Sequence, residues 1–232
     1  MIFKGGKISR IYQWLLELFF PVFCVCCNTE GVWLCSFCES LSFIDPRTAA
    51  SRSVVSLDTV VSMLPLSQPG MKELLHRYKY DCVSDIEHYI ARYIEHYFML
   101  YPHCFFHVPD VIMAVPLHKK RLVDRGFNQS VFIASIVGSQ LHLSVVEGVL
   151  SRVKHTPQLA TLSRVERFAH VKQAFMVCDT FHDYVGKHIL LNDDVFTTGA
   201  TMEACADVLL SAGAKSVCGL TVFKSGAEDV LS

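Results

Sequence analysis

The segment from residue 188 to residue 203 most restricts how this 232-residue chain can fold. A short apolar run, residues 189–191, is followed by two adjacent carboxylates, Asp193 and Asp194, then by a loop of small residues and an apolar helical pattern. A short run that is apolar throughout is typical of a strand buried on both faces of a parallel sheet. The order therefore predicts a parallel strand that ends on the two acids and leads through a tight loop directly into a helix.

The loop after the two acids has the composition of a phosphate site. Its residues are Thr197, Thr198, Gly199, Ala200 and Thr201. At a helix N-terminus, backbone N–H groups and the helix dipole favour an anion, hydroxyls add donors, and a glycine allows close approach. Asp193 and Asp194 would repel phosphate, but they would accept hydrogen bonds from sugar hydroxyls. Although aspartate and threonine are also ordinary helix caps, the uninterrupted order favours a ribose 5-phosphate group as the ligand.

The rest of the chain alternates strand and helix patterns. Strands are predicted at residues 111–115, 145–150, 189–191 and 216–223, with helices at 128–141 and 201–212. Two β-rich runs, 54–55 and 60–64, and two helical segments between 71 and 101, broken near Asp81, precede them. This alternation predicts a Rossmann-like α/β fold with a parallel sheet and helices on both faces. Ligands of such sheets bind at the carboxyl ends of the strands.

Two basic segments follow predicted strands. The first is expected to be a loop, and it carries Lys119, Lys120, Arg121 and Arg125, which could contact phosphates or face water. Asn128 and Gln129 could cap and begin the next helix. Lys79, near a helix end, could reach the site or complement the helix dipole. The second segment, residues 151–172, includes Arg152, Thr156, Gln158, Arg164 and Arg167, and a loop of this length inside a compact domain is typical of a functional lid or of disorder.

Five of the ten cysteines lie within fifteen residues. Cys24 with Cys27 and Cys35 with Cys38 each have the spacing that lets one turn present two thiolates, so the four predict a structural zinc site. Cys26 is left over. Two disulfides are the alternative reading, but the remaining cysteines lie singly among apolar neighbours, which indicates buried thiols and a reducing compartment. These are Cys82, Cys104, Cys178, Cys205 and Cys218.

The first 23 residues have the pattern of an amphipathic helix that stops at Pro21. Gln13 and Glu17 interrupt its apolar run, and Phe23 precedes Cys24 where a lipoprotein signal needs a small residue, so an export signal is not favoured. The helix would dock on its own domain or contact a membrane surface. No segment is apolar over the length that spans a bilayer. We therefore expect a cytoplasmic protein that could lie at the inner face of the membrane.

Several of these segments together resemble the ComF family of DNA-uptake proteins, over essentially the whole chain. Residues 115–129 resemble the family's most distinctive motif, and residues 76–80 its lysine-tyrosine stretch. Residues 188–203 resemble the ribose-phosphate signature of type I phosphoribosyltransferases. Residues 152–175 resemble the family's mobile hood, except that Leu159 and His170 stand where the family usually has Gln and Asn.

The resemblance implies an organisation in three parts. An N-terminal helix (1–23) and a double zinc ribbon-like module (24–45) would precede a type I phosphoribosyltransferase domain (46–232) with a flexible hood at about 151–172. A polar connector rich in turn formers, residues 44–53, favours the same boundary.

The resemblance also implies an accessory role in DNA uptake during natural transformation. The ligand would be phosphoribosyl diphosphate with Mg²⁺, or a nucleotide, and single-stranded DNA and a DNA-uptake helicase would be partners. The cations that would contact the diphosphate or the DNA are Lys79, Lys119, Lys120, Arg121 and Arg125. Because the net charge is only −1, any DNA track must be local. A nucleobase salvage phosphoribosyltransferase is the alternative function, and a ligand-sensing regulator without catalysis is a third.

Overall fold

The computed structural model describes residues 21–42, 55–80, 84–105, 107–154 and 174–226. The chain divides into two compact units, Met1–Ser42 and Phe43–Ser232. Several expectations from the sequence lie outside the described residues. They concern the helix before Pro21, the connector, Cys82, and the hood residues Thr156, Gln158, Arg164 and Arg167.

The described part of the first unit is a cysteine-rich turn followed by helix α2, Ser36–Leu41. An isolated antiparallel bridge joins Phe23 to Glu30, and Asn28 between them adopts a left-handed conformation with φ of 63°. Asparagine tolerates this conformation better than most residues, so the chain can reverse there. Cys35 caps α2, because its Sγ accepts a hydrogen bond from the backbone N–H of Cys38 at 3.5 Å.

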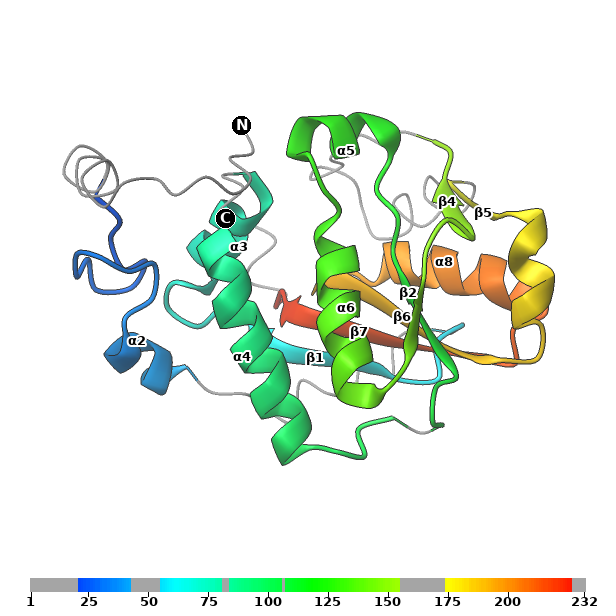
Figure 1. The fold of residues 1–232 in the computed structure, drawn as a ribbon, viewed down its shortest axis with the longest axis horizontal. Coiled ribbons are helices and arrows are strands. Elements are labelled where there is room, and N and C mark those ends of the chain that lie inside the picture. Colours follow the sequence, from blue (N-terminus) through cyan, green and yellow to red (C-terminus); the bar gives the residue numbers. More distant parts are fainter. Residues whose placement is uncertain (1–20, 43–54, 81–83, 106, 155–173, 227–232) are drawn as a thin grey trace, which may run out of the picture. The chain divides into compact units, whose positions relative to one another are not determined.

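The second unit contains a five-stranded sheet in the order β1-β7-β6-β2-β3, in which every pair of neighbouring strands is parallel (Figure 1). The strands are β1 Val60–Pro65, β2 Val111–Ala114, β3 Ser144–Val146, β6 His188–Phe196 and β7 Ser216–Lys224. All residues of β7 except Lys224 are buried, as expected for a central parallel strand. The predicted α/β fold class is confirmed.

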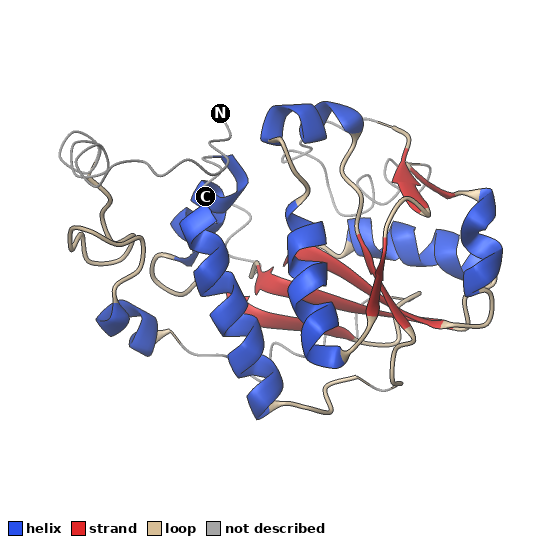
Figure 2. Ribbon diagram, viewed as in Figure 1, coloured by secondary structure: helices blue, strands red, loops and turns tan. Residues whose placement is uncertain are grey.

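Helices cover both faces of this sheet. The helices are α3 Met71–Tyr80, α4 Ser84–Leu100, α5 Lys119–Arg125, α6 Gln129–Leu141, α8 Ala200–Ser211 and the 3₁₀ helix η2 Asp179–Tyr184. Figure 2 shows α4 and α6 on one face and α8 on the other. Helix α8 buries Met202, Cys205 and Leu209 in a core that includes Leu191 and Val217. Among the described helices, none has both the length and the hydropathy needed to cross a bilayer.

Some local expectations are wrong. Residues 145–150 are not one strand, because Gly148 turns the chain with φ of 79° and the following strand β4, Leu150–Arg152, pairs with β5, Phe175–Val177, in a separate two-stranded sheet. Val55 lies in a bend, not in a strand. The basic segment 119–125 is a helix, since His118 caps its start and Gly126, in the left-handed conformation, ends it.

Candidate functional site

The two adjacent carboxylates lie inside strand β6, His188–Phe196, whereas the sequence predicted that the strand ends on them. The strand continues to Phe196 because it pairs with β7 over its whole length, up to Lys224. Asp194 is buried, with 6% of its surface exposed, and Asp193 is partly exposed. Because all five strands are parallel, this carboxyl end of β6 lies at the same edge of the sheet as the segments that lead into α3 and α5.

Asp193 accepts two hydrogen bonds within the site. Its Oδ1 accepts from Ser130 Oγ at 2.9 Å and from the backbone N–H of Asp194 at 2.9 Å. Burial, together with the charge of Asp194, nevertheless raises the pKa of Asp193 to about 7, and these hydrogen bonds and the charge of Lys79 only partly oppose the rise. Asp193 therefore changes its charge near neutral pH.

Lys79 reaches this acid pair from the last turn of α3. Its Nζ lies 3.0 Å from Asp194 Oδ2, and the two side chains are only 15% and 9% exposed. Of the two roles that the sequence left open for Lys79, the structure places its side chain in the site. One of the two neighbouring negative charges is therefore balanced within the protein.

The threonine-rich loop leads directly from β6 into α8. Gly199 precedes the first helical residue with φ of 79°, a conformation that favours glycine, and its carbonyl accepts from the backbone N–H of Glu203 at 2.9 Å. Thr198 Oγ1 accepts from the backbone N–H of Ala200 at 3.4 Å, and Thr197 is exposed. The positive end of the dipole of α8 therefore lies directly after a turn that carries two hydroxyls, those of Thr197 and Thr198. This is the arrangement expected of an anion site.

The cations of α5 differ in their surroundings. Lys119 and Lys120 are exposed, whereas Arg121 and Arg125 are partly buried. Arg125 donates from Nη1 to Gln129 Oε1 at 3.3 Å and from Nη2 to the hydroxyl of Tyr80 at 3.5 Å. Arg125 thereby joins α5 to the last residue of α3 and to the first residue of α6.

Asn128 acts as the helix cap that the sequence allowed. Its Oδ1 accepts from the backbone N–H of Ser130 at 3.1 Å, and its Nδ2 donates to the carbonyl of Val115 at 3.0 Å. The cap fixes the start of α6 against the end of β2. Ser130 is thereby held where its hydroxyl contacts Asp193.

Arg152 is the one residue named for the hood that the structure describes. Its guanidinium lies 5.2 Å from the ring centroid of Phe175 on the paired strand β5. Burial and then the charge of Arg121 lower the pKa of Arg152, while the charge of Asp193 acts in the opposite direction. The base of the hood therefore brings a second arginine into the same neighbourhood as Arg121 and the acid pair.

The sequence did not single out Ser130, and it gave Tyr80 only as part of the lysine-tyrosine stretch at residues 76–80. A hydroxyl in the first turn of a helix that follows a cationic loop would have pointed to Ser130. Tyr80 adjoins Lys79, but its contact with Arg125 joins residues 45 positions apart and has no local signal.

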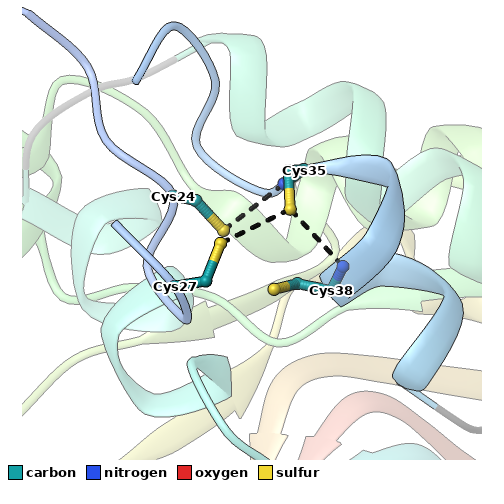
Figure 3. A group of neighbouring side chains, drawn as sticks. All are labelled: Cys24, Cys27, Cys35 and Cys38. Atoms are coloured by element: carbon teal, nitrogen blue, oxygen red, sulfur yellow. Dashed lines mark hydrogen bonds between the residues drawn. The ribbon is translucent and has the colours of Figure 1, made fainter. Parts of the chain in front are cut away.

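The four paired cysteines form the cluster that their spacing predicted. The Sγ atoms of Cys24, Cys27, Cys35 and Cys38 all lie within 4.8 Å of one another (Figure 3). Four sulfurs at a zinc–sulfur distance of about 2.3 Å in a tetrahedron would be separated by about 3.8 Å. No disulfide joins any of the described cysteines. The cluster could therefore hold zinc.

The protonation of these thiols also suits a cation. Burial opposes ionisation of Cys24, but backbone donors, among them the N–H of Cys35, lower the pKa of its thiol to about 6. The hydrogen bond with Cys27, followed by burial, raises the pKa of Cys38. Four thiolates so close together repel one another, and a divalent cation between them would remove that repulsion.

The second unit is an α/β domain whose strand β6 carries two adjacent acids and leads through a threonine-rich loop into α8, and the first unit carries a cluster of four cysteines. No family model matches the chain. It is 29% identical over 110 residues to competence protein F of Haemophilus influenzae, covering 47% of this chain and 48% of that protein. It is 31% identical over 150 residues to the DNA utilization protein YhgH of Salmonella typhimurium, covering 64% and 65%. It is 30% identical over 158 residues to competence protein ComFC of Bacillus subtilis, covering 67% and 60%.

The chain is thus a homologue of proteins named competence protein F, ComFC and YhgH, and its resemblance to the ComF family is confirmed. The match spans about half the length of competence protein F. Among solved structures, phosphoribosylpyrophosphate synthetase from Mycobacterium smegmatis aligns with a TM-score of 0.33 at 17% identity, over 62% of this chain and 34% of that one. An alanine mutant made to analyse an invariant aspartic acid in HPRTs aligns with 0.36 at 13%, over 61% and 68%.

Proposed function

We propose that this protein is a ComF-like accessory protein of DNA uptake in natural transformation, whose α/β domain binds phosphoribosyl diphosphate with Mg²⁺, or a nucleotide. The role in DNA uptake is supported by its relatives, two of which are named competence proteins and one a DNA utilization protein. The phosphoribosyltransferase domain would comprise residues 46–232 and the zinc module residues 24–45. A DNA-uptake helicase is the partner that this role implies.

One observation carries the ligand assignment. Asp193 and Asp194 lie near the carboxyl end of a central parallel strand, and five residues after Asp194 the chain turns at Gly199 into the N-terminus of α8. The loop and the helix dipole would hold the 5-phosphate. The two carboxylates would accept hydrogen bonds from the ribose hydroxyls.

The cations around the acids suit the diphosphate of the same ligand. Lys79 lies against Asp194, and Arg121 lies near enough to Arg152 for its charge to lower the pKa of Arg152. Like charges gathered in this way are stabilised by an anion between them. Magnesium would bridge the phosphate oxygens, and the carboxylates supply the oxygen ligands that it prefers, so a separate metal cage is not required.

The proposal is tested by calorimetric titration of phosphoribosyl diphosphate, with and without Mg²⁺, into the native protein and two variants. Thr198→Ala and Asp194→Asn should each weaken binding about tenfold or more. The first removes a hydroxyl that would donate to the charged 5-phosphate, and the second removes a carboxylate charge that strengthens the hydrogen bond from a ribose hydroxyl. Thr180→Ala and Asp183→Asn are matched controls, since both lie exposed on η2. Equal affinity in all five proteins would exclude this site.

The same preparation shows whether catalysis accompanies binding. Diphosphate released only when a free nucleobase is added would identify a salvage phosphoribosyltransferase. Ligand binding without release would support the accessory role.

A further inference from the structure

We infer that Tyr80, together with His76 and Arg125, forms a stacking site for a base of single-stranded nucleic acid beside the acid pair. This inference rests on the proposed role in DNA uptake and names a binding surface for the DNA.

The three side chains form one cluster from two helices. His76 and Tyr80 lie one turn apart on α3, with ring centroids 4.9 Å apart and an angle of 42° between the rings. Both are exposed, Tyr80 to 49%. The guanidinium of Arg125 on α5 lies 5.2 Å from the centroid of the Tyr80 ring. Flat aromatic and guanidinium groups at a surface are the groups on which unpaired bases stack.

Two connections place the cluster beside the acid pair. Tyr80 follows Lys79, whose Nζ contacts Asp194. Arg125 donates to the side chain of Gln129, and the next residue, Ser130, donates to Asp193. A strand that stacks a base on Tyr80 would therefore pass the proposed ribose-phosphate site.

The local charge suits a phosphate backbone. Helix α5 carries Lys119, Lys120, Arg121 and Arg125 against one acid, Asp124. On the same stretch of α3, Glu73 is already paired with Arg77 at 2.7 Å. Helix α5 is therefore positive in a chain whose net charge is only −1. Exposed cations beside stacking groups favour single strands without regard to their sequence.

A purely structural role predicts a different behaviour. Aromatic pairs one turn apart and cation–π contacts also stabilise exposed helices, by a few tenths of a kcal/mol to about 1 kcal/mol. If that were their whole purpose, replacing Tyr80 would lower the melting temperature and leave nucleic-acid affinity unchanged.

The test measures fluorescence anisotropy of a labelled oligo-dT of about 15 nucleotides over a range of salt concentrations. Tyr80→Leu should weaken binding about tenfold at every salt concentration without changing the salt slope, because stacking releases no counterions. Tyr80→Phe, which keeps the ring, should bind as the native protein does. Arg125→Gln should weaken binding and also reduce the log–log salt slope by roughly 0.7.

Tyr89→Leu is the matched control, because Tyr89 is a partly exposed tyrosine of α4 that also lies beside a histidine, with 6.0 Å between its ring centroid and that of His88. It should leave affinity unchanged. The inference is overturned if the native protein does not bind the oligonucleotide, if Tyr80→Leu binds it normally, or if Tyr80→Leu weakens duplex binding equally.

Titration of phosphoribosyl diphosphate into the same proteins separates this inference from the proposed function. Retained phosphoribosyl-diphosphate binding with normal DNA affinity in Tyr80→Leu overturns the stacking site alone. Absent phosphoribosyl-diphosphate binding with a tenfold loss of DNA affinity in Tyr80→Leu supports the stacking site and removes the phosphoribosyl ligand alone.

Discussion

The Nζ of Lys79 lies 3.0 Å from Asp194 Oδ2, and this ion pair joins the last turn of α3 to the central strand β6. Both side chains are largely shielded from water, so neither charge can be hydrated as it would be in the unfolded chain. Asp193, the adjacent acid, adds a second negative charge when it is ionised. The lysine therefore makes it possible for the acid pair to be buried at this edge of the sheet.

We predict that Lys79→Met destabilises the protein substantially. Removal of one partner of a buried pair leaves an uncompensated charge, which costs on the order of 3 kcal/mol. The methionine keeps most of the apolar stem, so the loss reports the charge more than the packing. Urea unfolding followed by circular dichroism measures it.

Lys72→Met on the same helix is the control, because Lys72 is exposed and its replacement should change stability by less than about 0.5 kcal/mol. Equal stability of Lys79→Met and the native protein would show that the ion pair does not balance the buried acids.

The pKa of Asp193 predicts a pH dependence of stability. Burial and the charge of Asp194 raise this pKa from an ordinary value of 3.8 to about 7. Between these two values the native state holds a proton that the unfolded state has released, so this group lowers the free energy of unfolding as the pH rises from about 4 to about 7. Asp193→Asn should remove that decrease and be more stable than the native protein at about pH 8.

Urea midpoints at several pH values measure this effect. Asp183→Asn is a suitable control, because Asp183 is exposed on η2 and should leave the pH profile of the native protein unchanged. A parallel pH profile for Asp193→Asn and the native protein would mean that Asp193 is already ionised throughout this range.

The strand, loop and helix of the site could be predicted because their signals are local. Residues 189–191 are apolar, Gly199 is required by its positive φ, and α8 follows at once. The position of the acids could not be predicted in the same way. Strand β6 extends through Asp193 and Asp194 to Phe196 only because β7, far along the chain, pairs with it there.

The other features that the sequence did not predict also depend on contacts between distant parts of the chain. Strand β4 forms because Arg152 pairs with Phe175 on β5, more than twenty residues away. The reach of Lys79 to Asp194 depends on how α3 packs, which no local pattern specifies. The cysteine cluster was predictable because its two paired spacings are themselves the signal.

The cysteine cluster predicts about one zinc ion per chain. Cys35→Ser should lose the zinc, because it removes a sulfur that lies 3.6 Å from that of Cys27 and also caps α2. Structural zinc supplies folding free energy, so this variant should also expose the first unit to proteolysis. Elemental analysis of protein purified under reducing conditions measures the metal.

Cys26→Ser is the matched control, since Cys26 lies in the same turn but is not one of the four clustered thiols. It should retain the zinc. Native protein without zinc, or equal zinc in Cys35→Ser and Cys26→Ser, would rule out the four-cysteine site.

We predict that replacing Asn192, which lies next to the site, stabilises the protein. It is fully buried in β6, and neither atom of its amide has a hydrogen-bond partner among the residues that the structure describes. Because a buried amide without a partner costs about 1–3 kcal/mol, Asn192→Leu, which has a similar volume, should raise the urea midpoint. Asn192→Ala should gain less, since it leaves a cavity. If Asn192→Leu is less stable than the native protein, the amide has a partner such as a buried water, and the cost is already compensated.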